Sequence, residues 1–240
     1  TTSGKTEEAL TSSYFDGLNA PAEERALVEG CRALTSADEQ TALGHLRSSV
    51  HLADGAYLAG FVSLSLGLIP EAIAHLEEAA RRAPELGQYF SRYEFMAAMS
   101  LPITPEIIAH VEPDLRGTLL GLVEAYQREQ RWHDAILALR HLRELMPTDV
   151  VVSLSLAELL MEAFPDNPDA CQEVLMASQG IENESALHAA LLLYRGKAHV
   201  QLGEHEHALQ AFERGLSVTD DRPPSLLETL GHERALLLQG

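Results

Sequence analysis

The residues that could support metal chemistry are histidines, and their spacing argues against a metal site. Eleven histidines occur, and the densest group is the segment GEHEH at Gly203–His207. If a helix begins here, His205 and His207 lie on different sides of it because they are two residues apart. His188 and His199 have no obvious carboxylate partners in the sequence. A metal site needs three or four converging ligands, so we predict no bound metal.

Other catalytic patterns are equally weak. The N-terminal TTSGKT ends like a phosphate-binding loop, with Lys5 and Thr6 in the contact positions, but that motif also needs an earlier glycine and a preceding strand. A polar arm is the simpler interpretation. No GxSxG elbow occurs, and neither Cys31 nor Cys171 lies in a catalytic or ligand signature. We predict a protein that is not an enzyme and uses no cofactor.

Composition narrows the classes of partner. Thirty-six acidic residues against 17 basic ones give a formal charge of −19, which repels phosphate backbones and anionic membranes. No apolar run approaches the roughly 18 residues of a membrane span. Two isolated cysteines favour a reducing compartment, so we expect a cytoplasmic location. The chain starts at Thr1 without methionine, which keeps a soluble domain of a membrane-anchored protein as the alternative.

Pairs of amphipathic helices are the elements that must position these residues. The clearest pair is Leu119–Pro147. Its first helix carries Leu119, Leu122 and Tyr126 on one face, and a polar turn follows at Gln130–Arg131. Proline stops the second helix. The high apolar and low aromatic content, 46% and 5%, suits close packing of helix against helix.

The spacing of this pair recurs along the chain. Small anchor residues in the second helices are Ala72, Ala135, Ala170 and Ala208, and bulkier residues follow four positions later at Leu76, Leu139, Val174 and Phe212. Intervals of about 35 to 38 residues between the last three anchors are typical of one helical hairpin per repeat. The sequence therefore predicts an array of helical hairpins.

These residues resemble the tetratricopeptide repeat family, of bacterial type. Gly60 and Gly196 match the small residue at its eighth position, whereas Val123 and Glu158 depart from it. The resemblance implies an all-α, right-handed solenoid superhelix. We expect hairpins near residues 21–52, 55–84, 88–111, 116–147, 151–178 and 186–217, with a polar arm and short helix over 1–20 and a terminal or truncated helix over 224–240.

The resemblance also implies where a partner binds. In that family the first helices line a concave groove, and their fifth, ninth, twelfth and thirteenth positions usually face the ligand. An aromatic cluster at residues 89–95 lies close by, and it is either part of this groove or core packing. The predicted contact residues are Tyr57, Phe61, Leu64, Tyr89, Tyr93, Leu120, Gln127 and Lys197.

The function that these inferences favour is a scaffold that binds a peptide or partner protein in its concave groove. The alternative is the sensor or regulatory region of a larger transcriptional regulator or membrane-tethered protein. An enzyme ranks third. The sequence leaves open the identity of the partner and the oligomeric state, because a repeat array says little about its ligand.

Overall fold

The computed structural model describes residues 20–95, 98–181, 185–218 and 223–239. The chain divides into two compact units, of which unit 1 comprises Thr1–Ser100 and His110–Arg131, and unit 2 comprises Leu101–Ala109 and Trp132–Gly240. The polar arm and short helix predicted over residues 1–20 lie almost wholly outside the described residues.

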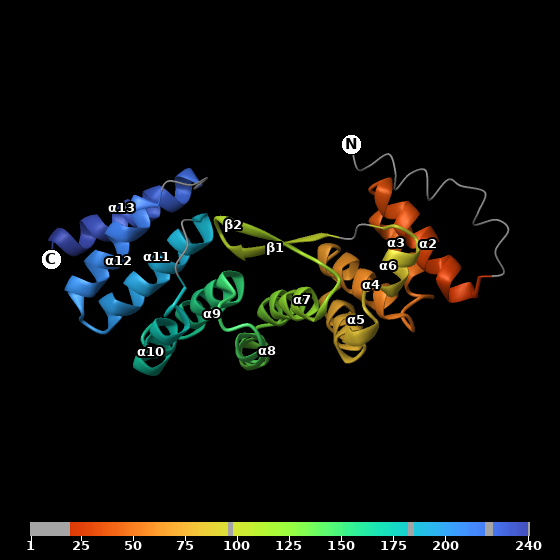
Figure 1. Ribbon diagram of the computed structural model, residues 1–240, viewed down its shortest axis with the longest axis horizontal. Helices are drawn as coiled ribbons and strands as arrows, with labels where there is room; N and C mark the ends of the chain where they lie inside the picture. The colour runs from red at the N-terminus through yellow and green to blue at the C-terminus, as the bar shows by residue number, and fades with distance from the viewer. Residues whose placement is uncertain (1–19, 96–97, 182–184, 219–222, 240) are drawn as a thin grey trace. The chain divides into compact units, whose positions relative to one another are not determined.

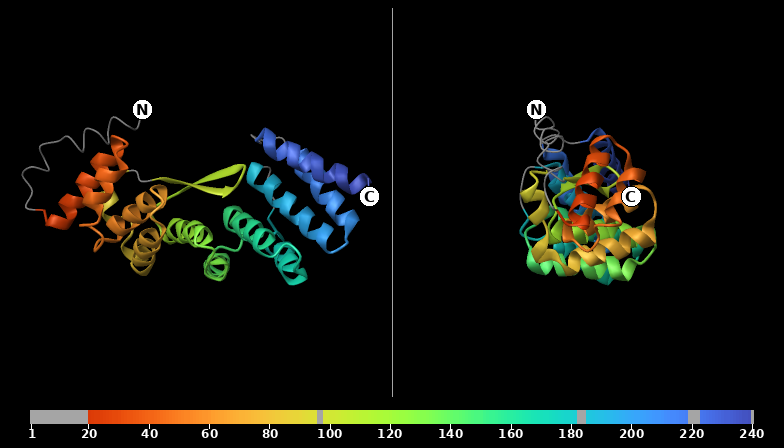
Figure 2. Two further views of the ribbon diagram at one scale, coloured as in Figure 1. Left: turned by 180° about the vertical axis from the view of Figure 1, so that it is seen from behind. Right: turned by 90° about the vertical axis from the view of Figure 1, so that its right-hand side faces the viewer.

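Unit 1 consists mainly of helices that pack against their neighbours in the chain (Figures 1 and 2). They are α2 (Ala22–Thr35), α3 (Glu39–Leu46), α4 (Ala53–Ser65), α5 (Ile69–Arg81), the short 3-10 helix η1 (Ala83–Glu85), α6 (Gln88–Arg92) and α7 (Leu115–Arg128). Helix α2 pairs with α3 and α4 pairs with α5, and α7 packs on α5. Three-residue turns separate the helices of both pairs, residues 36–38 between α2 and α3 and residues 66–68 between α4 and α5.

Unit 2 continues the same construction. Its helices are α8 (Trp132–Leu145), α9 (Val150–Ala163), α10 (Pro168–Ala177), α11 (Ala186–Gln201), α12 (His205–Ser217) and α13 (Pro224–Gln239). Helices α9 and α10 form one pair and α11 and α12 another, and α13 packs on α12. The predicted fold class, a helical-repeat architecture, is confirmed. None of the described helices combines the length and apolar character needed to cross a membrane.

Small residues let the paired helices approach closely. A Cβ atom added to Gly60 would lie 2.5 Å from Cγ of Leu76, and one added to Gly30 would lie 2.6 Å from Cδ2 of Leu46. At Gly196 the added atom would collide with the ring of Phe212. Real Cβ atoms never come this close, so each glycine is the socket for a bulky residue of the following helix.

The segment 88–111 corrects the sequence analysis, which predicted a helical hairpin there. It contains the short α6 and then two strands, β1 (Met99–Thr104) and β2 (Ile107–Val111), which pair into a two-stranded sheet. Pro102 and Pro105 cannot sit inside a helix. Burial in β2 alternates strictly from Ile107 to Val111, which is the period of a strand with one covered face. The β-branched residues of both strands favour this conformation.

Candidate functional site

Four of the predicted contact residues lie in the core of unit 1. Tyr57, Phe61, Leu64 and Leu120 are each at most 4% exposed. The rings of Tyr57 and Phe61 are 4.7 Å apart, and the Tyr57 hydroxyl donates to the backbone oxygen of Val111 at 3.4 Å. Phe61 also packs under Gly121 of α7, where an added Cβ would lie 2.7 Å from its Cζ. A partner cannot reach side chains in these positions.

The reason is the composition of α4 itself. Residues 53–64 are all buried, and Asp54 is the only charged residue among them. A helix that is apolar on every side must be covered on every side, whereas a groove-lining helix needs a polar or exposed face. In unit 1 that cover comes mainly from α5 and α3, and α7, α6 and η1 add smaller contacts.

Tyr89 and Tyr93 are half-buried and hold the α6 segment in place. The Tyr93 hydroxyl donates to Oε2 of Glu24 at 2.6 Å, and Arg92 donates to the same oxygen at 3.0 Å. Burial, followed by this contact with the Glu24 carboxylate, raises the pKa of Tyr93 to about 12. The guanidinium of Arg92 lies 5.6 Å from the centre of the Tyr89 ring. Within unit 1, these two tyrosines therefore act first as packing residues.

Asp54 on α4 holds the start of the short helix α6 in place. Its fully buried carboxylate accepts hydrogen bonds from the backbone N–H groups of Gly87 at 2.6 Å, Tyr89 at 2.8 Å and Phe90 at 3.1 Å. Burial raises the pKa of Asp54, and the three hydrogen bonds oppose that rise. The carboxylate satisfies N–H groups that the start of α6 leaves without helical partners.

The remaining two predicted residues are partly exposed. Gln127 is half-buried on α7 of unit 1. Lys197 on α11 of unit 2 lies in the wall of a groove, and it is the one residue of the predicted set that the structure places in a described hollow. The predicted set is thus divided between the core and the surface of two separate units.

The groove of unit 2 runs between α9, α11 and α13 and encloses about 370 Å³. We call it the acidic groove. Its lining residues are Glu158, Met161, Glu162, Pro165, Tyr194, Lys197, Val200, Gln201 and Glu233. Three carboxylates thus face one ammonium group, so the lining has an excess of negative charge in a strongly acidic chain. Such a surface attracts cations and repels anions.

Lys197 is held at one side of the acidic groove. Its Nζ lies 3.6 Å from Oε1 of Glu233 on α13 and 5.6 Å from the centre of the Tyr194 ring. Burial and the nearby carboxylates of Glu158, Glu106 and Glu162 raise the pKa of Tyr194. The hydroxyl therefore stays protonated at neutral pH. The arrangement can accept a positively charged group beside the groove carboxylates.

A second hollow of about 350 Å³ lies in unit 1 and is more apolar. Its walls include Phe90, Phe95, Ala98 and Pro113, together with Gly87, Ser91, Glu94 and Glu112. The aromatic cluster is therefore both core and surface, because Phe90 is buried and Phe95 is half-buried. Neither Tyr89 nor Tyr93 lines this hollow.

Sequence reasoning missed Glu158 and Glu233 as groove residues. The signal for Glu158 was available, because a carboxylate occupies an eighth position that the repeat pattern reserves for a small residue. No site was inferred from that departure in the sequence analysis, whereas the structure places Glu158 in the wall of the acidic groove. Glu233 had no signal, since only the packing of α13 on α12 brings it to Lys197.

The contacts between glycine and a bulky residue sixteen positions later occur in α2–α3, α4–α5 and α11–α12. The same separation lies between the small eighth position and the bulky residue of the tetratricopeptide pattern, which these helix pairs resemble. No family model matches the chain, and no curated protein matches it in sequence. Solved structures that it resembles include a tetratricopeptide repeat protein from Parabacteroides merdae, at 16% identity over 98% of this chain and 78% of that one, with a TM-score of 0.45. A tetratricopeptide protein from Thermus thermophilus shows 15% identity over 91% of this chain and 100% of that one, with a TM-score of 0.44.

Proposed function

We propose that the protein is a binding scaffold without catalytic activity, and that the acidic groove of unit 2 binds a partner-protein segment carrying a lysine or arginine side chain. The observation that carries the proposal is the groove lining, which contains three glutamates and one cationic residue, Lys197. A cationic side chain gains charge-assisted hydrogen bonds from such carboxylates.

The position of the acidic groove in the repeat supports the same conclusion. Glu162, Lys197, Val200 and Gln201 occupy ligand-facing positions in the tetratricopeptide pattern, and all four line the groove. The ninth and twelfth positions of α4, Phe61 and Leu64, are closed by packing. The proposal therefore moves the binding surface from the Tyr57–Phe95 region to unit 2. The alternative role, as a regulatory region of a larger protein, stays a prediction and is compatible with the same groove.

The test is the affinity of a defined peptide for matched variants. Peptides are selected from a random display library on the immobilised protein, and the dissociation constant of the best sequence is measured by fluorescence anisotropy. We expect selected sequences to contain Lys or Arg. We also expect the double change Glu158→Gln with Glu162→Gln to weaken binding at least about tenfold, because it removes two of three attracting charges.

The control is Glu144→Gln, which removes one negative charge from the exposed surface of α8, outside the groove lining. It should change the affinity by less than about twofold, since a distant exposed charge is screened by salt. Selection of acidic or purely apolar peptides, or an equal loss in the Glu144→Gln protein, would show that the groove does not recognise a cation.

A further inference from the structure

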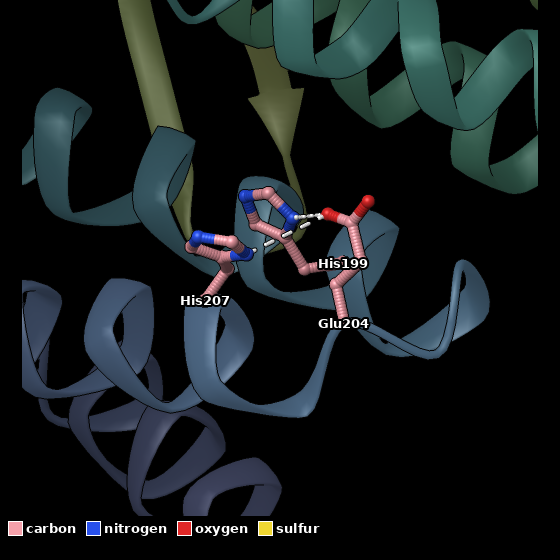
Figure 3. Close-up of side chains that lie close together, drawn as sticks. All are labelled: His199, Glu204 and His207. Atoms are coloured by element: carbon pink, nitrogen blue, oxygen red, sulfur yellow. Dashed lines mark hydrogen bonds and ion pairs between the residues drawn. The ribbon is translucent and has the colours of Figure 1, made fainter.

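Three potential metal ligands meet at the turn between α11 and α12 (Figure 3). Nδ1 of His199 lies 2.7 Å from Oε2 of Glu204, and Nδ1 of His207 lies 3.9 Å from the same oxygen. Their ligand atoms all lie within 4.8 Å of one another. We call these residues the His199–Glu204–His207 cluster. In the sequence analysis, His207 was considered as a ligand together with His205. In the fold, His207 instead lies beside His199 of the preceding helix, α11.

The backbone holds these ligands in fixed places. Glu204 directly precedes α12, and its N–H donates to the carbonyl oxygen of His199 at 2.9 Å, which closes the turn. Gly203 has a φ of +74°, a conformation that glycine adopts without strain. His207 lies in the first turn of α12. Two helix ends and one short turn thus set the spacing of all three side chains before any ion arrives.

The turn itself does not require these side chains. The same backbone hydrogen bond closes the equivalent turns at Asp38, Leu68 and Arg131, each directly after a residue with positive φ. An aspartate, a leucine and an arginine therefore all serve in the place of Glu204. The Glu204 carboxylate also makes no capping hydrogen bond with the N–H groups of α12. Its contact with His199 is therefore not explained by the needs of the helix end.

Burial gives the cluster one closed side and one open side. The His199 side chain is 10% exposed, whereas those of Glu204 and His207 are 40% and 67% exposed. The ring centroids of the two histidines are 5.3 Å apart, so an otherwise exposed ring is kept beside a buried one. A bound ion would have protein ligands on one side and room for water on the other, which is the pattern of zinc sites with three protein ligands.

We propose that His199, Glu204 and His207 bind one divalent transition-metal ion, with Zn²⁺ as the best match, and that water completes a tetrahedral site. Imidazole nitrogen and carboxylate oxygen are both common zinc ligands. Bonds of about 2.0–2.1 Å place the ligand atoms of a tetrahedral site about 3.3 Å apart. The two distances to Glu204, 2.7 Å and 3.9 Å, lie on either side of that value, and all three ligand atoms lie within 4.8 Å of one another, so metal binding requires side-chain rotations that draw the ligand atoms together.

The test is zinc binding by the full chain after removal of metal with a chelator. Isothermal titration calorimetry and native mass spectrometry should show one tightly bound Zn²⁺, and Co²⁺ should give the intense visible absorption of a tetrahedral site. We expect Glu204→Gln and His207→Ala each to weaken zinc binding more than about 100-fold. Loss of a supporting residue alone costs about 10–100-fold, and a direct ligand costs more.

The matched control is His205→Ala, which removes an exposed histidine from the same helix start but outside the cluster. It should change the zinc affinity by less than about threefold. Thermal melts monitor the fold of each variant. Glu204 and His207 are more exposed than His199, so their substitution disturbs the core less. Absence of stoichiometric zinc in the unmodified protein, or an equal loss in the His205→Ala protein, would overturn the proposal.

Discussion

At the scale of single residues, Asp54 is the polar group on which unit 1 depends most. Its buried carboxylate accepts three backbone hydrogen bonds from the segment that starts α6. We predict that Asp54→Ala lowers the free energy of unfolding by about 3 kcal/mol, because removing the acceptor leaves buried N–H groups unsatisfied. Urea denaturation followed by circular dichroism measures this change.

Asp38 provides the comparison for that measurement. It precedes α3 and accepts a single hydrogen bond from the N–H of Thr41 at 3.0 Å in an exposed position. Asp38→Ala should therefore cost only about 1 kcal/mol, as for an ordinary helix cap. Equal effects of the two substitutions would mean that the α6 segment is not held by Asp54.

The ion pair between Arg47 and Glu71 predicts a specific dependence on pH. Hydrogen bonds from Arg47, at 2.6 and 2.7 Å, are the largest cause that lowers the pKa of Glu71 from 4.5 to about 2. The folded pKa is thus below the unfolded one, so the pair stabilises the fold above about pH 4.5 and this contribution is lost as pH falls toward 2. In Arg47→Gln, an NMR titration should show the Glu71 pKa returning toward 4.5. A Glu71 pKa that stays near 2 in that variant would assign the shift to another group.

At the scale of elements, the close packing of α4 on α5 predicts that adding a methyl group to different glycines changes stability in opposite directions. Gly60→Ala should destabilise the fold by about 1–3 kcal/mol, because the new methyl group would overlap Leu76. Gly44→Ala on α3 should instead stabilise it by about 0.5–1 kcal/mol, since nothing lies within 4 Å of the added Cβ and alanine favours a helix. Thermal unfolding of the two variants measures both signs, and stabilisation by Gly60→Ala would contradict the socket arrangement.

Helices whose small and bulky residues recur at a regular spacing could be predicted from the sequence. Segments whose secondary structure depends on neighbouring elements could not. The small anchors and the bulky residues four positions later predicted α5, α8, α10 and α12 because their spacing follows a helix face. A fifth such set, Gly30, Ala42 and Leu46, was overlooked although its spacing matches that of Gly60, Ala72 and Leu76. The segment that forms β1 and β2 was assigned to a helical hairpin because the repeat spacing outweighed the signal of Pro102 and Pro105.

The candidate site was less predictable than the fold, for a physical reason. A ligand-facing position in a repeat pattern says where a side chain points, and only the neighbouring elements decide whether it stays exposed. Tyr57 and Phe61 have the correct spacing, but α7 and the α6 segment cover them. Lys197 has the same kind of spacing and lines the acidic groove. The His199–Glu204–His207 cluster also depends on a turn that brings two helices together.

At the scale of the whole molecule, two compact units carry different surfaces. Unit 1 has a mainly apolar hollow beside Phe90 and Phe95, whereas unit 2 has the acidic groove. The formal charge of −19 repels anionic partners from the chain as a whole and speeds the approach of cationic ones. Recognition is therefore expected to be local to unit 2 and to weaken as salt screens the charges.

The most direct test of this account is the map of NMR chemical-shift changes when a selected lysine- or arginine-containing peptide is added. The account predicts changes concentrated on α9, α11 and α13, including the amides of Glu162, Tyr194 and Lys197, and loss of these changes at high salt. Changes concentrated instead on the residues around Phe90, Phe95 and Pro113 would place the binding surface in unit 1 and contradict the central claim.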